Sequence, residues 1–548
     1  MKYSYIFLLL HFLFLNKTEA QVKCPKGINS EDAAQLKKLY DATNGGKWRY
    51  TKNWNNLDSL NWRGVKWLVN QDECRVESIS LYNNNLTSNL PNDLQFPFLQ
   101  TLDLSVNDLI GQIPDFNFVG LKNLDLSRNE FTGTIPLFSN LKDLETLNLS
   151  VGNNSKIDGI LPLFEFPKLK TLGLSNINIR GKTPVWNFPL LEVLNLSFAK
   201  FDTINEQIML PNLKRLNLSD CPNLHGDVSV FHNSKKLNDL NISSTKIGLG
   251  AVKIFDNLEY LNMSRNELSG EILGFLLPTL KKLDISSNEY SGSLAFIEKM
   301  PRLEIFIANN NQFQSLDFQT PSSTLKEFYI SGNHLRDCMN QIDFSRLTKL
   351  DVRLNWLDFG DFSKMKISKS TDFAYNIQYP INFKVDYSFG NVATLYTGVG
   401  NPKGENTYKW SSNKSTNLVA DNLRTNDTLF VPFVSGVYNC TIINPRYPEL
   451  TIRTNDQFVI TDNDERPGDF VIHPNISNGF FNVHFYRFVP YNIKFRVYNA
   501  NGELIFTKEK SPAPSEVDFD LSNLPNGVYF LEVNSSVKKS IEKFVISK

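Results

Sequence analysis

Residues 99–109 read LQTLDLSVNDL, and the chain repeats the pattern L-x-x-L-x-L-x-x-N-x-L about thirteen times. Close copies are LKNLDLSRNEF at 121–131 and LEYLNMSRNEL at 258–268. The copies follow at intervals of 21 to 25 residues and begin at Val76, Leu99, Leu121, Leu144, Leu169, Leu191, Leu213, Leu237, Leu258, Leu280, Leu303, Leu325 and Leu347. Self-similarity at such a period predicts stacked structural repeats over residues 76–360.

The spacing of the leucines has a physical cause. Each L-x-L pair puts two side chains on one face of a short strand, because side chains alternate along a strand. One repeat cannot bury its own leucines but stacked neighbours can, so we expect a curved solenoid with a parallel sheet on its concave side. The asparagine at the turn can bond backbone groups that would otherwise be buried without partners. These asparagines are Asn84, Asn107, Asn129, Asn266, Asn288, Asn311, Asn333 and Asn355.

The template resembles the leucine-rich repeat. Early copies continue into G-x-I-P-type segments at 111–114, 133–136 and 159–162, which resemble the plant-type subfamily of that repeat. This resemblance implies a second short strand on the flank of each repeat. Later copies lack the proline, so we expect the C-terminal half to be less regular. The predicted fold is an α/β-type leucine-rich-repeat solenoid of about 13 repeats, followed by two small all-β sandwich domains.

The first 20 residues have the pattern of a secretory signal peptide. Lys2 is followed by an apolar run from Ile6 to Leu15, and small residues lie before a cleavage point after Ala20. The apolar run is too short to span a bilayer, and no later segment is long and apolar enough to do so. We expect a mature chain that begins at Gln21 and has no transmembrane segment.

Residues 21–75 are expected to cap the first repeat. Ser30 precedes an acidic helix start and is the predicted N-cap, and the Asn-Gly-Gly sequence at 44–46 is the predicted stop. Four tryptophans follow: Trp48, Trp54, Trp62 and Trp67. They could form a sugar-binding platform, but such residues more often cover the open edge of a first repeat.

Five cysteines are present, so at least one thiol remains free in an exported protein. Cys24 and Cys74 bracket the cap and are the predicted disulfide. The other three are widely spaced and are expected to be small buried residues: Cys221, Cys338 and Cys440.

Three further segments follow the repeats. Residues 361–384 are expected to end the solenoid. Residues 385–461 resemble an immunoglobulin-like sandwich, because the Gly-Val-Tyr-Asn-Cys run at 436–440 resembles its tyrosine corner and Trp410 would be its core tryptophan. The usual partner cysteine is missing. Residues 462–468 are polar and are interpreted as a linker.

Residues 469–548 resemble the C-terminal sorting domain of the Bacteroidetes-type type IX secretion system. The residues that carry the resemblance include Pro474, Gly479, Gly502, Leu524, Gly527, Tyr529 and Lys543. The resemblance implies recognition by the secretion machinery, export across the outer membrane, and removal of this domain. Gly502 and Gly527 each follow an asparagine, which predicts hairpin turns with positive φ at both glycines.

Signs of catalysis are scarce. Lys+Arg and Asp+Glu both number 57, so the charge balance does not favour a nucleic-acid partner. The sequence contains no P-loop, G-x-S-x-G, H-E-x-x-H or C-x-x-C motif, and we predict neither cofactor, metal site nor catalytic residues. The N-x-S sequences arise from the repeat itself and are discounted as glycosylation signals.

The concave face is the remaining candidate site. Outward positions there are mostly bland, but they become richer between Leu191 and Leu280. The candidate residues are Phe198, Arg215, Asp239, Tyr260, Arg265 and Lys282. Aromatic and arginine side chains are enriched at interface centres. We predict a secreted or cell-surface protein that binds a protein or polysaccharide ligand through this face. The alternative is a surface glycan-active enzyme with the repeats as its targeting module.

Overall fold

The chain divides into two units that are described separately. The computed structural model describes residues 24–54, 60–152, 156–248, 255–272, 277–319, 321–386, 392–400, 404–412, 427–432, 436–459, 470–485, 493–510, 516–535 and 539–548. The predicted signal peptide and the linker at 462–468 lie outside these residues. The first unit comprises Met1–Leu357 and Asp361–Ile377, and the second comprises Asp358–Gly360 and Gln378–Lys548.

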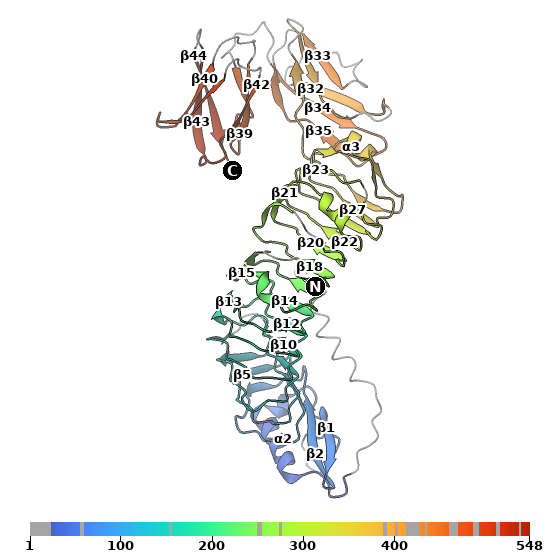
Figure 1. Ribbon diagram of the computed structural model, residues 1–548, viewed down its shortest axis with the longest axis vertical. Coiled ribbons are helices and arrows are strands. Elements are labelled where there is room, and N and C mark those ends of the chain that lie inside the picture. Colours follow the sequence, from blue (N-terminus) through green and yellow to red (C-terminus); the bar gives the residue numbers. More distant parts are fainter. Residues whose placement is uncertain are drawn as a thin grey trace. The chain divides into compact units, whose positions relative to one another are not determined.

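A long sheet runs through the first unit (Figure 1). Within the described residues it has 15 strands, and it starts with β1 (Val65–Asn70), which pairs antiparallel with β2 (Glu73–Ser80). All later neighbours are parallel, one strand per repeat: β4 (Thr101–Asp103), β6 (Asn123–Asp125), β8 (Thr146–Asn148), β10 (Thr171–Gly173), β12 (Val193–Asn195), β14 (Arg215–Asn217), β16 (Asp239–Asn241), β18 (Tyr260–Asn262), β20 (Lys282–Asp284), β22 (Ile305–Ile307), β24 (Glu327–Tyr329), β27 (Lys349–Asp351) and β29 (Asp372–Ala374). The predicted parallel-sheet solenoid is confirmed.

Most strands of the long sheet bury a central leucine, which Phe306 and Phe328 replace in β22 and β24. In β14, Leu216 is 1% exposed, whereas Arg215 and Asn217 are half-buried. Leu213 and Leu218, at the other template positions of this repeat, are fully buried. The leucines of successive repeats therefore form one continuous core, which no single repeat could form alone.

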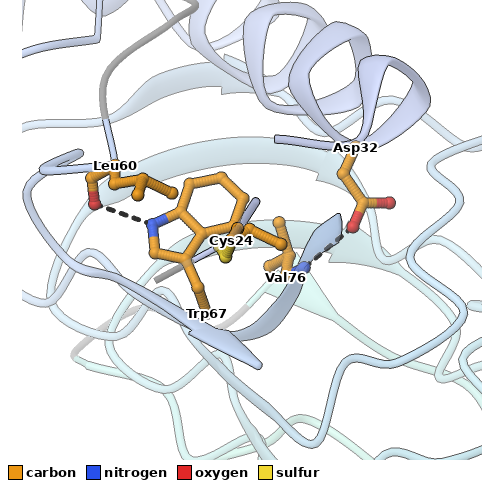
Figure 2. Close-up of a disulfide and its surroundings, with 6 residues drawn as sticks. Cys24, Asp32, Leu60, Trp67 and Val76 are labelled. Atoms are coloured by element: carbon orange, nitrogen blue, oxygen red, sulfur yellow. Dashed lines mark hydrogen bonds between the residues drawn. A yellow bond between two sulfur atoms is a disulfide. The ribbon is translucent and has the colours of Figure 1, made fainter. Parts of the chain in front are cut away.

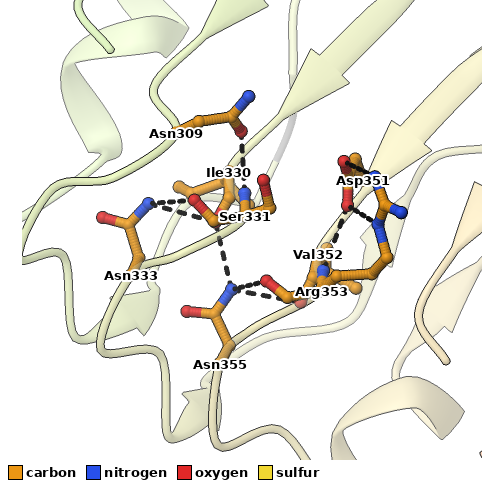
Figure 3. Close-up of polar contacts among 8 residues, drawn as sticks. All are labelled: Asn309, Ile330, Ser331, Asn333, Asp351, Val352, Arg353 and Asn355. Carbon is orange, nitrogen blue, oxygen red and sulfur yellow. Dashed lines mark hydrogen bonds and ion pairs between the residues drawn. The ribbon is translucent and has the colours of Figure 1, made fainter. Parts of the chain in front are cut away.

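The asparagines of the template form a ladder between repeats. Asn333 is fully buried, and its Nδ2 donates to the carbonyl oxygen of Ala308 at 2.9 Å. The same Nδ2 donates to the Ile330 carbonyl at 3.0 Å (Figure 3). Its Oδ1 accepts the N–H of Phe313. Asn355 repeats the pattern one turn later and reaches back to the Ile330 carbonyl. Each amide thus satisfies backbone groups of two repeats, as predicted for these positions.

The ladder changes in the middle of the solenoid. Cys221 occupies the ladder position of its repeat, and its thiol donates to the Leu196 carbonyl at 3.2 Å. Thr245 takes the next position and donates through its hydroxyl to Ile242. The repeats between residues 150 and 245 therefore stack with fewer amide bonds than those on either side.

Short strands on the flank of the repeats form further parallel sheets. The first flank sheet comprises β3 (Thr87–Asn89), β5 (Asp108–Gln112), β7 (Glu130–Gly133) and β9 (Lys156–Ile157). The second flank sheet comprises β11 (Arg180–Lys182), β13 (Lys200–Thr203), β15 (His225–Asp227) and β17 (Lys246–Gly248). Only strand pairs follow: β19 (Ser269–Glu271) with β21 (Glu289–Ser291), β23 (Ser315–Leu316) with β25 (Asp337–Cys338), and β26 (Ile342–Asp343) with β28 (Met365–Lys366). This shortening agrees with the expected loss of regularity.

The cap consists of helix α2 (Ser30–Ala42) and a set of buried tryptophans. The predicted N-cap was one residue late: Asn29 caps the helix, and its side chain accepts the N–H groups of Glu31 and Asp32. Asn29 has the non-helical φ and ψ that a cap requires, whereas Ser30 is already helical. The cap tryptophans are at most 8% exposed, so none offers a stacking platform: Trp48, Trp54, Trp62 and Trp67.

Cys24 and Cys74 form a disulfide that ties the start of the cap to β2 (Figure 2). Their Cα atoms are 5.4 Å apart and 50 residues separate them in sequence. Close by, the buried carboxylate of Asp32 accepts the backbone N–H of Val76 at 2.8 Å and pairs with Arg75 at 2.9 Å. The disulfide and this ion pair both join the cap to the first strands of the long sheet.

Replacing both Cys24 and Cys74 by alanine is expected to lower the free energy of unfolding of the cap by about 3–5 kcal/mol, since the cross-link closes a long loop in the unfolded chain. Denaturant unfolding followed by tryptophan fluorescence measures the change. A reducing agent should destabilise the wild type and leave the double variant unchanged. Peptide mapping without reductant that found free thiols at both positions would contradict the assignment.

The second unit begins with two small antiparallel arrangements. One contains β30 (Lys384–Asp386), β31 (Val392–Tyr396) and β33 (Thr428–Pro432), and the other β32 (Thr407–Ser412), β34 (Gly436–Ile443), β35 (Thr451–Arg453) and β36 (Gln457–Val459). Tyr438 is fully buried between them. Trp410 is only half-buried, lies opposite Cys440 on the neighbouring strand, and packs its ring 5.4 Å from that of Phe383. Tyr438 rather than Trp410 is therefore the central aromatic residue.

The last part of the chain forms two sheets around one apolar core. The smaller sheet contains β37 (Phe470–His473), β39 (Phe480–Phe485) and β42 (Glu516–Asp520), and the larger contains β38 (Ile476–Ser477), β44 (Lys539–Ile546), β43 (Gly527–Ser535), β40 (Ile493–Asn499) and β41 (Leu504–Lys510). Phe495, Phe519 and Phe544 are buried between them. The all-β character predicted for the C-terminal region is confirmed.

The two predicted hairpin glycines differ in the structure. Gly502 lies in the turn between β40 and β41 with a φ of 82°, as expected. The prediction for Gly527 is wrong, because this residue starts β43 and is not among the positive-φ glycines. Strands β42 and β43 belong to different sheets, so Asn526 and Gly527 connect the sheets and do not form a hairpin turn.

Candidate ligand-binding surface and sorting domain

Four of the six candidate ligand-binding residues lie side by side on the outward face of the long sheet. Arg215, Asp239, Tyr260 and Lys282 each occupy the first position of their strand, and the strands pair in register: Arg215 with Asp239, Asp239 with Tyr260, and Tyr260 with Lys282. Neighbouring strands are about 4.8 Å apart, so these side chains form one continuous row. We call this set of four the central row.

The four side chains of the central row have no polar partners among the described residues. None of its four side chains makes a hydrogen bond or an ion pair with any residue that the structure describes. Tyr260 is 40% exposed, and the other three are half-buried. Burial raises the pKa of Asp239, while the positive charges of Arg215 and Lys282 oppose that rise. The row therefore offers a carboxylate, two cations and a phenol to a ligand.

Phe198 and Arg265 lie elsewhere. Each occupies the turn that follows its strand, with a φ of 58° for Phe198 and 55° for Arg265. Phe198 is 55% exposed and Arg265 is also exposed, but three repeats separate the two. The structure thus divides the six candidates into a row of four and two separate turn residues.

Charged residues one position before the central row are already paired. Glu192 contacts Lys214 at 3.0 Å, and Glu259 contacts Lys281 at 2.8 Å. Two further pairs of the same kind are Glu145–Lys170 and Glu304–Lys326. The alternation of L-E and L-K at the repeat starts is the sequence signal for these ion pairs, which were not predicted.

Some polar side chains in the repeats after the central row are also paired. The Tyr329 hydroxyl donates to Glu327 at 2.9 Å, and burial together with this bond raises the pKa of Tyr329 to about 12. Arg353 makes a bidentate pair with Asp351 (Figure 3). Pairing of polar side chains on this face therefore also occurs after the central row.

The N-x-S asparagines have a structural role. Asn217 accepts the backbone N–H of Ser219 at 3.1 Å, and Asn241 does the same for Ser243. Asp284 replaces asparagine in an identical contact with Ser286. The motif thus closes the turn after each strand, which accounts for its recurrence.

Groups typical of catalysis or metal binding do not come together in the described part of the chain. No three or more His, Cys, Asp or Glu side chains there could hold a metal ion. Cys221, Cys338 and Cys440 are buried thiols, and burial raises their pKa values to about 12, 11 and 12. Over the same residues, no helix has the length and apolar content needed to span a membrane.

The predicted sorting motif supports the core of the last two sheets. Tyr529 is 4% exposed and its hydroxyl donates to the Pro525 carbonyl at 2.7 Å. Leu524 packs against the same core. Pro474 precedes β38, and Lys543 lies on β44 opposite Phe530.

Gly479 is the most constrained residue of the motif. Its φ is 108°, and a Cβ there would lie 2.6 Å from the Cα of Ser522. Backbone approaches this close exclude every other residue type. This constraint was not predicted, because a close contact between distant segments leaves no local signal in the sequence.

Comparison with known families agrees with this geometry. Residues 120–141 and 257–277 match the leucine-rich repeat family, and residues 471–547 match the family described as secretion system C-terminal sorting domain. This is a leucine-rich-repeat protein. It carries a type IX secretion sorting domain, which indicates export to the cell surface or the extracellular space. No curated protein sequence matches the chain significantly.

The chain is also similar to several solved structures. The ectodomain of the receptor kinase GASSHO1/SCHENGEN3 from Arabidopsis thaliana is 21% identical with a TM-score of 0.50, over 63% of this chain and 47% of that one. YopM from Yersinia enterocolitica is 27% identical with a TM-score of 0.40, over 51% and 56% of the two chains. An internalin from Listeria monocytogenes is 17% identical with a TM-score of 0.44, over 65% and 98%. The chain spans about half the length of the first two.

Proposed function

We propose that this secreted or cell-surface protein recognises a protein or glycan ligand through the outward face of its long sheet, at the central row. The observation that carries the proposal is the contrast in pairing. Arg215, Asp239, Tyr260 and Lys282 are in register and have no hydrogen-bond or ion-pair partner within the described part of the chain. Charged neighbours such as Glu192 and Lys214 pair with each other. Unpaired arginine and tyrosine side chains at the centre of a surface are the groups that contribute most to binding.

The row also explains how a ligand could be selected. Asp239 lies between cations that are not in ion-pair contact with it, so a ligand that bonds to the carboxylate does not first have to break an existing pair. Tyr260 adds a ring on which an apolar group or a sugar face can pack. Phe198 and Arg265 would contribute at the edge of such a complex, from the turns.

Binding of the full chain to glycan and protein arrays identifies a ligand, and variants then locate the site. Changing Arg215, Asp239 and Tyr260 to alanine is expected to weaken binding by at least about tenfold, as for central interface residues. The matched control changes the paired residues Glu145 and Lys170 to alanine, and affinity should stay within about twofold. Each change should alter stability by less than about 0.5 kcal/mol, and circular dichroism checks the fold.

A separate variant tests the turns, with both Phe198 and Arg265 changed to alanine. A larger loss here than in the central-row variant would move the site to the turn residues. Unchanged affinity in both variants would contradict the proposed surface. Release of reducing sugar from glycans by the secreted protein would instead support the enzyme alternative.

A further inference from the structure

The second flank sheet presents an array of basic side chains to solvent. Phe201 and Ile247 point into the core and are 1% and 4% exposed, so the residues beside them point outward. The exposed basic residues on these four strands are Arg180, Lys182, Lys200 and Lys246, with His225 between them. Figure 1 shows β13 and β15 on the flank of the repeats, beside strands β12 and β14 of the long sheet.

These cations are unpaired. None of the four Lys and Arg side chains makes a hydrogen bond or an ion pair with a residue that the structure describes. Elsewhere on the repeats lysines are commonly paired, as Lys168 is with Asp143 at 2.6 Å. The two aspartates on the sheet accept backbone N–H groups instead: Asp202 from Gly181 at 3.1 Å, and Asp227 from Ser229 at 2.7 Å.

The sign of the charge changes along the flank. The first flank sheet carries Asp108 and Glu130, and Glu130 contacts the lysine at position 156. The pair β19–β21, on the other side, carries Glu271 and Glu289. Positive charge is therefore concentrated on the second flank sheet and bordered by acidic residues, although the protein as a whole has no net charge.

The basic residues are aligned by the sheet. Arg180 pairs in register with Lys200, whereas Lys182 pairs with Thr203, which is followed in register by His225 and Lys246. Parallel strands are about 4.8 Å apart, so the basic side chains form a band along the solenoid, with Arg180 and Lys200 on one side and Lys182, His225 and Lys246 on the other. A linear partner with repeated negative charges would match this band, and the summed field would attract it.

We propose that the second flank sheet binds a linear anionic polysaccharide. Among the described residues, no exposed large apolar side chain lies on these four strands. A protein interface would normally have aromatic or apolar anchors at its centre, and membrane insertion would need apolar side chains as well. Charge without apolar anchors fits a hydrated polyanion best. This surface is distinct from the central row and goes beyond the function proposed for it.

Binding of the full chain to polygalacturonate and dextran sulfate tests the proposal, with uncharged dextran as the control polymer. The wild type is expected to bind both polyanions, to lose affinity as salt is added, and to ignore dextran. Changing Arg180, Lys182, Lys200 and Lys246 together to glutamine should weaken binding about tenfold, since each exposed charge contributes modestly.

The matched control removes the same charge from lysines that are paired, by changing Lys142, Lys168, Lys170 and Lys214 to glutamine. Its affinity for the polyanions should stay within about twofold of the wild type, as should that of the central-row variant. Equal losses in both glutamine variants, or no binding to either polyanion, would overturn the proposal. Equally tight, variant-sensitive binding to phosphatidylserine vesicles would assign the surface to lipid instead.

Discussion

Deletion of residues 469–548 is expected to abolish delivery to the cell surface and leave the remaining chain folded in the periplasm. These residues match the sorting-domain family almost from end to end and form their own apolar core, which includes Phe495, Phe519 and Phe544. The repeats bury their leucines against one another. Cell fractionation and surface protease digestion measure the outcome.

The converse experiment uses the same segment as a signal. Fusing residues 469–548 to an unrelated reporter with a signal peptide should carry that reporter to the surface. Full surface delivery of the truncated protein, or failure of the fusion to leave the periplasm, would contradict a sorting role and leave an additional β-sandwich as the explanation.

Point variants can test whether export requires the sorting domain to be folded as well as present. Gly479→Ala is expected to remove most export, because the added Cβ would meet the Ser522 backbone at 2.6 Å in a conformation that favours glycine. Gly527→Ala is the control, since its nearest neighbour is the Tyr529 ring at 3.7 Å and its backbone is that of a strand. Export of Gly527→Ala should stay near the wild-type level, and equal loss in both would contradict this explanation.

Asn333→Ala is expected to lower the free energy of unfolding by about 1–3 kcal/mol, the cost of an unsatisfied buried group. The change leaves the Phe313 N–H without its side-chain partner. The Ala308 and Ile330 carbonyls each lose one bond but keep a second donor, Asn311 and Asn355 respectively. Denaturant unfolding of the full chain, followed by circular dichroism, measures the effect.

The control for this ladder variant is Asn123→Ala. Asn123 is exposed and its side chain makes one hydrogen bond, to Thr101 at 3.3 Å. Its replacement should change stability by less than about 0.5 kcal/mol. Similar losses in the two variants would mean that the ladder contributes no more than an ordinary surface amide.

Local features account for both the successes and the errors of sequence analysis. The solenoid could be predicted because each leucine is buried by its equivalent one repeat away, so the same short pattern recurs. The helix cap was placed at Ser30 instead of Asn29, because both residue types are good caps and only the backbone angles distinguish them. Gly527 was assigned to a hairpin because sequence does not show that its two flanking strands join different sheets.

The candidate ligand-binding surface also has features that the sequence predicted and features that it did not. Sequence selected Arg215, Asp239, Tyr260 and Lys282 by residue type, and the register of the long sheet makes them neighbours. It also selected Phe198 and Arg265, which the structure places in separate turns. The alternation of L-E and L-K at the repeat starts indicates pairs such as Glu259–Lys281, but the sequence does not show which of the other charges stay unpaired.

By itself, the sequence determined the repeat architecture and the sorting domain, since both depend on side-chain types at fixed local spacings. The tertiary structure alone decided which charges remain available. It paired Glu192 with Lys214, left the central row unpaired, and aligned Arg180 with Lys200 on the second flank sheet. The physical reason is that burial and pairing depend on distances between residues about 20 positions apart, and stacking of the repeats sets those distances.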